Sequence, residues 1–364
     1  MRKGDDTVSK TLLIDLGSTS IKFAIFDKEN KIKSTVSSFP FPNPLSNPSP
    51  LFEVNAEDIV QPILKMIESV SPVDRIYIST QMHGYLLGTR DGKLLTPYIS
   101  WQDQRSTLHM NGHRLLDQFP VRLPPISGST IRPNSPTCSL FAMSHIDPEL
   151  FSQATEFYTL GSYLAYHLTG VNATHITDAA ASGMYNKEDG SPQFNIYPFL
   201  RTPQATLKVE PVGHWGQTAV YSPVGDQQAS VRGSGLQHEH QYLLNLGTAA
   251  QLCVVSDAYQ FGDFESRPYF EGKTLCTVSG LLGGKEIATQ THSLKFVQLL
   301  ADDYFTAMGK LPARKEILVI GGVSIHHREL IADVCDSLQI PCRIRPDTDA
   351  LDGLISLLLE EITT

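Results

Sequence analysis

The chain has 364 residues, of which 41% are hydrophobic and 18% are charged, and 29 Lys and Arg against 38 Asp and Glu leave a formal net charge of -9. Because this length exceeds what one hydrophobic core usually supports, two domains are expected in a soluble globular protein. No apolar run approaches the ~20 residues that cross a bilayer, which excludes a membrane span. No basic cluster is present, which argues against nucleic acid as a partner.

The first residues, Met1 to Lys10, are charged and polar and lack the apolar centre of a secretory signal. We therefore expect the protein to stay in the cytoplasm. The cysteines show no CxxC spacing, and most lie in apolar stretches, where reduced Cys behaves as a small hydrophobic residue. Neither disulfides nor a zinc site are expected at Cys138, Cys253, Cys276, Cys335 and Cys342.

Apolar patterning in the first half predicts three opening strands, at residues 10–16, 20–27 and 31–38. The Pro-rich segment Phe39–Leu51 cannot continue a sheet and predicts a surface loop.

Residues 56–69 carry Ile59, Ile63 and Ile67 at helical spacing, which predicts a helix that contains Pro62. A buried strand is expected at 75–80 and a helix at 160–169. For most of the segment from 105 to 215 the pattern predicts no topology.

The second half alternates more regularly between strand and helix patterns. Strands are predicted at 241–247, 250–256, 274–279, 317–320 and 341–345, and helical runs at 286–309, 325–338 and 350–361. Three strands followed by alternating helices and strands make an α/β domain, and the first half opens in the same order. Two such domains, at 1–218 and 219–364 with a cleft between them, predict the two-domain actin-like ATPase (ribonuclease H-like) fold.

A short sequence recurs at an offset of 230 positions, since Leu13–Ser20 is echoed without a gap by Leu243–Ala250. Each copy is an apolar strand followed by Gly, hydroxyl side chains and a second apolar run, which predicts a hairpin with a small-residue turn. Glycine lets the backbone approach an anion, and N–H and hydroxyl groups donate to phosphate oxygens. A single copy would favour an ordinary hairpin, but the repetition favours two phosphate-binding turns. Their residues are Gly17, Ser18, Thr19, Gly247 and Thr248.

Asp226 follows Gly225 where an apolar segment turns toward a predicted helix. Its carboxylate either caps that helix or orients a hydroxyl group and accepts its proton during phosphoryl transfer, and the two roles are compatible. Asp15, beside the first turn, suits Mg²⁺, which prefers carboxylate and water oxygens. Its counterpart Asn245 lacks the charge, as expected if only one of the two turns binds the metal ion.

Six segments in order resemble the motifs of one family. They are "DLGSTSIK" from Asp15, "QMHG" from Gln81, "WQDQRS" from Trp101, "GDQQAS" from Gly225, "NLGTAAQL" from Asn245, and the pair Gly321-Gly322. The chain resembles the FGGY carbohydrate kinases, which phosphorylate sugars with ATP. Within that family, "WQDQR", "GDQQASV" and "GTAAQL" look most similar to sedoheptulokinase, and xylulokinase comes next because it also uses "QMHG".

The resemblance implies a role for each segment. Asp226 would be the base toward a primary hydroxyl, and Asp15 would hold Mg²⁺. The implied contacts to ATP are Gly17, Ser18, Thr19, Lys22, Gly247, Thr248, Gly283, Gly321 and Gly322. The implied sugar contacts are Gln81, Met82, His83, Trp101, Asp103 and Gln227, a set that combines apolar surface for the carbon face with hydrogen-bonding groups for the hydroxyls.

Several of these residues also have an ordinary structural interpretation. His83 could be a hydrogen-bonded core histidine, and Trp101 could simply be core. Asp103 and Arg105 could form a surface ion pair worth under about 1 kcal/mol, and Lys22 could be a solvated strand residue. The joint order of the segments favours a site.

Two functional hypotheses stand, and a third is less favoured. The first is a kinase that uses ATP and Mg²⁺ to phosphorylate a primary hydroxyl of a ketose, sedoheptulose-like or xylulose-like, through domain closure that excludes water. The second is a catalytically weak descendant that binds a sugar or nucleotide as a sensor. An actin-like filament or chaperone ATPase would not explain the sugar-site segments.

One departure from the family pattern affects the second half. Residues 285–317, between "SGLLGG" and the strand leading to Gly321, leave room for one long helix where family members usually carry several. We therefore expect a shortened C-terminal domain. The expected partner is a small-molecule sugar and a homodimer is allowed, while the choice of sugar and of the phosphorylated carbon stays open.

Overall fold

The computed structural model describes residues 10–120, 131–192, 197–247, 249–345 and 347–363. The chain divides into two compact units, Met1–Asp226 and Gln227–Thr364. The sequence pattern predicted the domain boundary after residue 218. In the structure the strands β14 (Thr218–Tyr221) and β15 (Val224–Gly225) stay with the first unit because both pair with β5 (Arg75–Thr80).

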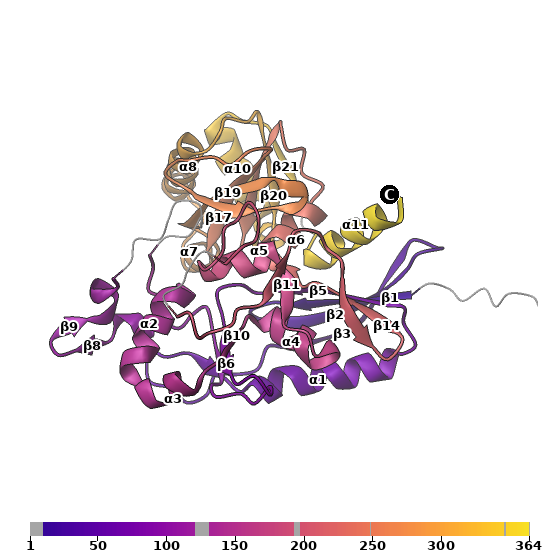
Figure 1. Cartoon of the computed structure of the whole chain (residues 1–364). Coiled ribbons are helices and arrows are strands. Elements are labelled where there is room, and N and C mark those ends of the chain that lie inside the picture. Colours follow the sequence, from indigo (N-terminus) through magenta and orange to yellow (C-terminus); the bar gives the residue numbers. More distant parts are fainter. Residues whose placement is uncertain (1–9, 121–130, 193–196, 248, 346, 364) are drawn as a thin grey trace, which may run out of the picture. The chain divides into compact units, whose positions relative to one another are not determined.

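A seven-stranded mixed sheet organises the first unit, in the order β13-β14-β5-β1-β2-β3 with β15 also pairing with β5. Its other strands are β1 (Lys10–Leu16), β2 (Ser20–Asp27), β3 (Ile32–Pro40) and β13 (Pro211–Trp215). β1 and β2 form an antiparallel hairpin, and β5 returns parallel to β1 after helix α1 (Ala56–Val70) (Figure 1). These elements confirm the strands and the helix predicted up to residue 80. The prediction that the sheet ends before Phe39 is wrong, because β3 continues through Phe39 and Pro40, which pair with Ile21 and Ser20 at the edge of the sheet.

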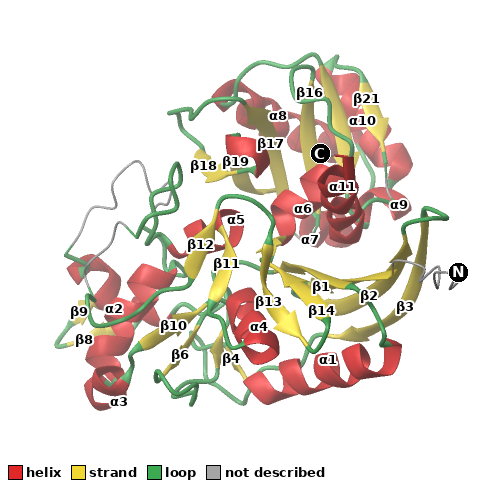
Figure 2. Ribbon diagram, turned by 45° about the vertical axis from the view of Figure 1, so that its right-hand side comes forward, coloured by secondary structure: helices red, strands yellow, loops and turns green. Residues whose placement is uncertain are grey.

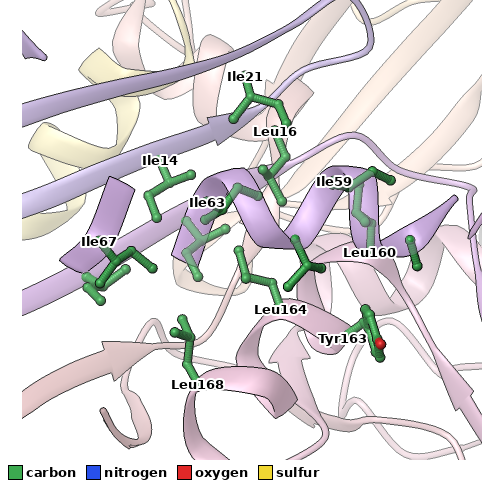
Figure 3. Close-up of a cluster of buried hydrophobic side chains, with 14 of the residues drawn as sticks. Ile14, Leu16, Ile21, Ile59, Ile63, Ile67, Leu160, Tyr163, Leu164 and Leu168 are labelled. Carbon is green, nitrogen blue, oxygen red and sulfur yellow. The ribbon is translucent and has the colours of Figure 1, made fainter. Parts of the chain in front are cut away.

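Helix α1 packs its apolar stripe into the core below this sheet. The side chain of Asn55 caps the helix by accepting the N–H of Glu57 at 3.3 Å, and Pro62 lies inside the helix without ending it. Figure 3 shows the core that α1 shares with β1 and helix α4 (Leu160–Thr169). The buried side chains drawn there include Ile14, Leu16, Ile59, Ile63, Ile67, Leu160, Leu164 and Leu168. Each such side chain contributes about 1.5–3 kcal/mol relative to exposure.

The middle of the first unit builds a smaller second layer of helices and two-residue or three-residue strands around its own apolar cluster. Its helices are α2 (Pro136–Ile146), α3 (Pro148–Gln153) and α5 (Ile176–Ala179), while α4 contributes its buried apolar side chains to the core of the large sheet. Its strands are β4 (Glu53–Val54), β6 (Leu86–Gly88), β7 (Tyr98–Ile99), β8 (His109–Met110), β9 (His113–Arg114), β10 (Glu156–Tyr158), β11 (Ala173–His175) and β12 (Gln204–Thr206). The strands are too short to produce a recognisable period in the sequence, although helix α4 was predicted.

A six-stranded sheet in the order β18-β19-β17-β16-β20-β21 organises the second unit. Its strands are β16 (Gln241–Leu246), β17 (Ala250–Ser256), β18 (Glu265–Pro268), β19 (Thr274–Leu281), β20 (Glu316–Ile320) and β21 (Cys342–Ile344). Its helices are α6 (Asp226–Gly233, which begins one residue before the unit boundary), α7 (Gly284–Thr289), α8 (Leu294–Lys310), α9 (Val323–His326), α10 (Arg328–Leu338) and α11 (Ala350–Thr363). The apolar side chains of the sheet, α8 and α10 form one cluster.

The two sheets share a strand arrangement. β1 is antiparallel to β2 and parallel to β5, and β16 is antiparallel to β17 and parallel to β20. The repeated sequence therefore corresponds to a repeated arrangement of strands. Both units are mixed α/β, as the sequence predicted.

Some predicted elements differ from the structure. The helical run at 286–309 is divided into α7 and α8, and the run at 325–338 is divided into α9 and α10 at His327. Strand β18 was not predicted. Between β19 and β20, α8 is the one long helix, in agreement with the predicted shortening. Within the described residues, the helices are too short or too polar to cross a membrane.

Candidate active site

Strand register brings three predicted site segments of the first unit to one edge of its sheet. β5 lies between β1 and β15 and runs parallel to both. Thr80 of β5 pairs with Leu16 on one side and with Gly225 on the other. Because carboxyl ends of parallel strands meet at the same edge, the turn after β1, the segment after β5 and Asp226 after β15 leave the sheet together.

The turn after β1 presents hydroxyl groups to solvent. The N–H of Gly17 donates to the carbonyl of Ser20 at 3.1 Å and closes the turn. A Cβ at position 17 would lie 3.0 Å from that same carbonyl, a tight contact that a side chain could make only with a small shift of the turn. Ser18 and Thr19 are exposed. These features suit the phosphate-binding turn that the sequence predicts.

Asp15 lies beside this turn and is almost fully buried. Its Oδ1 accepts the hydroxyl hydrogen of Ser79 at 2.7 Å, and Nζ of Lys22 lies 3.8 Å from its Oδ2. Lys22 is therefore partly exposed and paired with Asp15 rather than simply solvated. No cluster of three His, Cys, Asp or Glu side chains occurs among the residues that the structure describes. One carboxylate beside exposed hydroxyls fits Mg²⁺, which binds through one or two carboxylates, waters and substrate phosphates.

The "QMHG" segment is tied to the same turn. The backbone N–H of Gln81 donates to the carbonyl of Leu16 at 2.8 Å, and its side-chain Nε2 donates to the carbonyl of Gly17 at 3.4 Å. Met82 is buried. His83 adopts a left-handed backbone conformation with φ of 65°, which is uncommon for a residue other than glycine and which recurs at active sites.

The imidazole of His83 is oriented by a hydrogen bond, since Nδ1 donates to the carbonyl of Ala181 at 3.0 Å. Because a carbonyl only accepts, the proton lies on Nδ1. The side chain is partly exposed, so His83 is not the core histidine of the alternative interpretation. Its contact with a sugar stays a prediction.

The side chain of Tyr98 packs against Gly84 of this segment. A Cβ at Gly84 would collide with the Tyr98 ring and hydroxyl, which explains the glycine of "QMHG". The Tyr98 hydroxyl is buried and has no hydrogen-bond partner within the described part of the chain. Burial raises the pKa of Tyr98 well above its usual value, and the charges of Asp178 and Asp226 raise it further, so the phenol stays neutral.

The "WQDQRS" segment contains a buried ion pair, and the surface-pair interpretation of Asp103 and Arg105 is wrong. Both side chains are about 1–3% exposed. Oδ1 and Oδ2 of Asp103 accept from Nε and Nη2 of Arg105 at 2.9 Å each, and Nη2 also donates to Glu53 at 2.7 Å. Oδ2 of Asp103 further accepts the N–H of Phe52 at 2.8 Å.

These bonds tether the segment to β4 and engage both carboxylate oxygens of Asp103. The role of Asp103 in sugar binding therefore stays a prediction. Trp101, in the same segment, is partly exposed rather than core.

Asp226 is partly exposed and begins α6 directly after β15. Its carboxylate lies in the first helical turn, where the helix dipole favours negative charge. Exposure of this group satisfies one requirement for a base that must reach a substrate hydroxyl. Its capping and catalytic interpretations both stay open on this geometry.

In the second unit, glycines bring three backbone segments into close contact, those that follow β16, β19 and β20. The N–H of Gly284 donates to the carbonyl of Gly247 at 2.9 Å. A Cβ at Gly283 would lie 2.6 Å from the backbone nitrogen of Ala250, and one at Gly321 would lie 2.5 Å from the carbonyl of Leu246. Gly322 faces open space. The predicted nucleotide-side glycines are therefore gathered in one place, while Thr248 lies outside the described residues.

Gln227 begins the second unit and belongs to a polar network that the sequence pattern did not predict. Its Oε1 accepts from Nη1 of Arg267, and its Nε2 donates to Oε1 of Gln251 at 2.9 Å. Arg267 also pairs with Glu265 at 2.5 Å. Arg267 and Glu265 lie on β18, a short strand that ends at a proline and shows no apolar alternation, so the sequence held little signal for them. Sugar contact by Gln227 stays a prediction.

Residues 11–207 match the family model described as the FGGY family of carbohydrate kinases, N-terminal domain. The chain belongs to the FGGY family of carbohydrate kinases. The matched range includes the first turn, "QMHG" and "WQDQRS". Asp226 and the second unit lie outside it.

Relatives of this FGGY chain include two xylulose kinases. That of Escherichia coli strain K12 is 27% identical over 270 residues, which cover 68% of this chain and 54% of the relative. That of Bacillus subtilis strain 168 is 24% identical over 282 residues, which cover 71% of this chain and 55% of the relative. The chain thus spans about half the length of the curated relatives it matches.

Solved structures share the fold. A gluconate kinase from Lactobacillus acidophilus aligns with a TM-score of 0.81 at 16% identity, covering 98% of this chain and 90% of that one. A ligand-bound xylulose kinase from the same organism aligns with a TM-score of 0.80 at 15% identity, covering 97% and 90%. The two-domain actin-like ATPase fold predicted from the sequence is confirmed.

Proposed function

We propose that this FGGY chain transfers the γ-phosphoryl group of ATP to a primary hydroxyl of a ketose, sedoheptulose-like or xylulose-like. The observation that carries the proposal is the register of β1, β5 and β15. It places the turn with Thr19, the "QMHG" segment and Asp226 at one sheet edge although they are far apart in the sequence. The relatives named xylulose kinase support a ketose as the acceptor.

In this reaction Asp226 orients the acceptor hydroxyl and takes its proton. The hydroxyl oxygen forms a bond to the γ-phosphorus, and the bond from that phosphorus to the bridging oxygen of ADP breaks. Positioning and charge neutralisation supply most of the rate in such transfers, so an ordinary carboxylate suffices as base. Mg²⁺, when bound, neutralises phosphate charge, and Asp15 with the hydroxyls of Ser18 and Thr19 would hold it and the phosphates.

The two units would divide the substrates between them. His83, Trp101 and Gln81 of the first unit would contact the sugar. The gathered glycines of the second unit, Gly283 and Gly321 among them, would admit the nucleotide close to the backbone. The sugar-binding unit then corresponds to the first half of the chain and the nucleotide-binding unit to the second.

A kinase assay over ketoses and polyols tests the proposal, with ADP release measured for wild type, Asp226→Asn and the control Asp58→Asn. Asp58 is an exposed aspartate on α1. We expect sugar-dependent turnover in wild type and the control, and a loss of ~100-fold or more in Asp226→Asn, the scale on which positioned acid-base groups act.

Equal transfer by wild type and Asp226→Asn would overturn the assignment of the base. The short segment between β19 and β20 gives the sensor alternative its support. That alternative gains if neither protein shows sugar-stimulated turnover while a sugar still raises the melting temperature.

A further inference from the structure

The backbone that leads into Asp226 is held from two sides within the first unit. On one side, β15 pairs with β5. On the other, β11 and α5 form a buried polar layer that contacts the carbonyl of Pro223 and the N–H of Gly225. β11 pairs in parallel with β12 in this layer (Figure 2). None of the family segments recognised in the sequence includes β11 or α5.

A chain of hydrogen bonds links the carbonyl of Leu207 to the N–H of Gly225 through His175 and Thr177, and each donor in it is determined. Nε2 of His175 donates to the carbonyl of Leu207 at 3.2 Å, so its Nδ1 accepts. Nδ1 accepts the hydroxyl hydrogen of Thr177 at 2.9 Å, and the Thr177 oxygen accepts the N–H of Gly225 at 3.1 Å. Burial lowers the pKa of His175 to about 4, so the imidazole is neutral near pH 7 and keeps this tautomer.

A second set of bonds holds the carbonyl of Pro223. It accepts the backbone N–H of His175 at 2.8 Å and the hydroxyl of Thr174 at 2.9 Å. Thr174 also lies 2.8 Å from Oδ2 of Asp178. Because Thr174 has one hydroxyl hydrogen, a proton on Asp178 satisfies both contacts at once.

We propose that Thr177, oriented by His175, is a positioning residue for phosphoryl transfer that fixes the Gly225 peptide and thereby the carboxylate of Asp226. The inference rests on the proposed function of Asp226 as base. Gly225 is buried, so its N–H needs an acceptor within the protein. Removing that acceptor frees the peptide to shift, and displacement of a reacting group by about 1 Å can cost ~100-fold in rate.

Thr177→Val tests this role, because valine keeps the shape of threonine and removes the hydroxyl. We expect kcat to fall about 10-fold to 100-fold with the KM for sugar within about twofold, and Thr177→Ser to restore most of the rate. In an Asp226→Asn background the same substitution should cost little further, since the group that it positions is already gone.

Thr206→Val is the matched control. Thr206 pairs with His175 across β11 and β12, is buried, and within the described residues its hydroxyl has no hydrogen-bond partner. We expect its kcat to stay within about twofold of wild type, as for a buried hydroxyl that holds nothing. A loss in Thr206→Val as large as that in Thr177→Val would overturn the positioning role, as would failure of Thr177→Ser to restore the rate.

A readout without catalysis separates this inference from the proposed function. Hydrogen–deuterium exchange of the peptide that contains Gly225 should speed up in Thr177→Val and stay unchanged in Thr206→Val. Unchanged exchange in Thr177→Val would overturn the inference even in an active kinase. Faster exchange in a protein without kinase activity would leave the hydrogen bond confirmed and the proposed function wrong.

Discussion

The hydroxyl of Ser79 donates to Oδ1 of Asp15 across 2.7 Å, and the two residues are register partners on β5 and β1. This bond holds the carboxylate that stands beside the first turn. Because Asp15 is buried, its charge depends on such donors for stabilisation.

Ser79→Ala should therefore lower the free energy of unfolding of the first unit by about 1.5–3 kcal/mol, the contribution of a hydrogen bond to a charged group. Ser106→Ala is the control, since Ser106 is buried and donates to the neutral carbonyl of Pro133 at 2.7 Å. Its expected loss is about 0.5–1.5 kcal/mol. Urea denaturation followed by the chain's 2 tryptophans, Trp101 and Trp215, reports on the first unit alone. Equal losses would argue against a charged Asp15.

The ion pair of Arg105 should behave as a buried pair. Arg105→Met leaves the carboxylates of Asp103 and Glu53 without their cation, and breaking a buried pair on one side costs about 3–5 kcal/mol. Arg114→Met breaks an exposed pair, whose side chains are 42% and 59% exposed, and should leave the free energy of unfolding nearly unchanged because solvent screens such charges. The same fluorescence measurement compares them. A small loss in Arg105→Met would show that the segment is not anchored by this pair.

Two buried groups of the first unit should give opposite pH dependences of stability. Burial raises the pKa of Asp178 to about 7 from an ordinary 3.8, so the folded state holds a proton there that the unfolded chain releases as pH rises. Burial lowers the pKa of His175 to about 4 from 6.5, so the unfolded chain binds a proton there as pH falls. The stability linked to Asp178 is thus lost as pH rises from 3.8, its ordinary pKa, to about 7, its pKa in the folded state. That linked to His175 is lost as pH falls from 6.5 to about 4.

Between about pH 4.5 and 6.5 the two contributions to the pH dependence of the free energy of unfolding cancel. In the wild type this pair therefore changes stability little with pH over that range. Asp178→Asn removes one of them, and its stability should rise with pH by about 1.4 kcal/mol per unit relative to wild type over that range. Urea denaturation at several pH values measures the difference. The charge of Asp178 also raises the pKa of two buried phenols, Tyr98 and Tyr185, which stay neutral over this pH range. A pH-independent difference between the two proteins would mean that Asp178 is ionised when folded.

The neighbouring glycines Gly321 and Gly322 should respond differently to alanine. Gly321 has φ of 99° and a Cβ there would press on the carbonyl of Leu246, so Gly321→Ala should destabilise the second unit by about 2 kcal/mol or more. Gly322 has φ of -59° with open space around it, so Gly322→Ala should fold as well as wild type. Hydrogen–deuterium exchange in β16 and β20 measures both. Equal protection in the two variants would contradict the close packing at Gly321.

Local patterns in the sequence predicted much of the fold. The strands β1, β2 and β5 and the helices α1 and α4 came from apolar periodicity, which each segment carries by itself. The repeated turn and the family segments identified the candidate site. Strand β18 and the division of the run at 325–338 were missed because they lack such a period.

The sequence alone determined which residue types stand at strand ends and in which order, because strand, turn and helix preferences act over a few neighbouring residues. Tertiary structure decided which of these residues meet and which are buried. Thr80 joins Leu16 to Gly225, Arg105 is enclosed with Asp103, and Thr177 reaches the peptide before Asp226. Such contacts depend on pairing and packing between segments far apart along the chain, and no local preference specifies them.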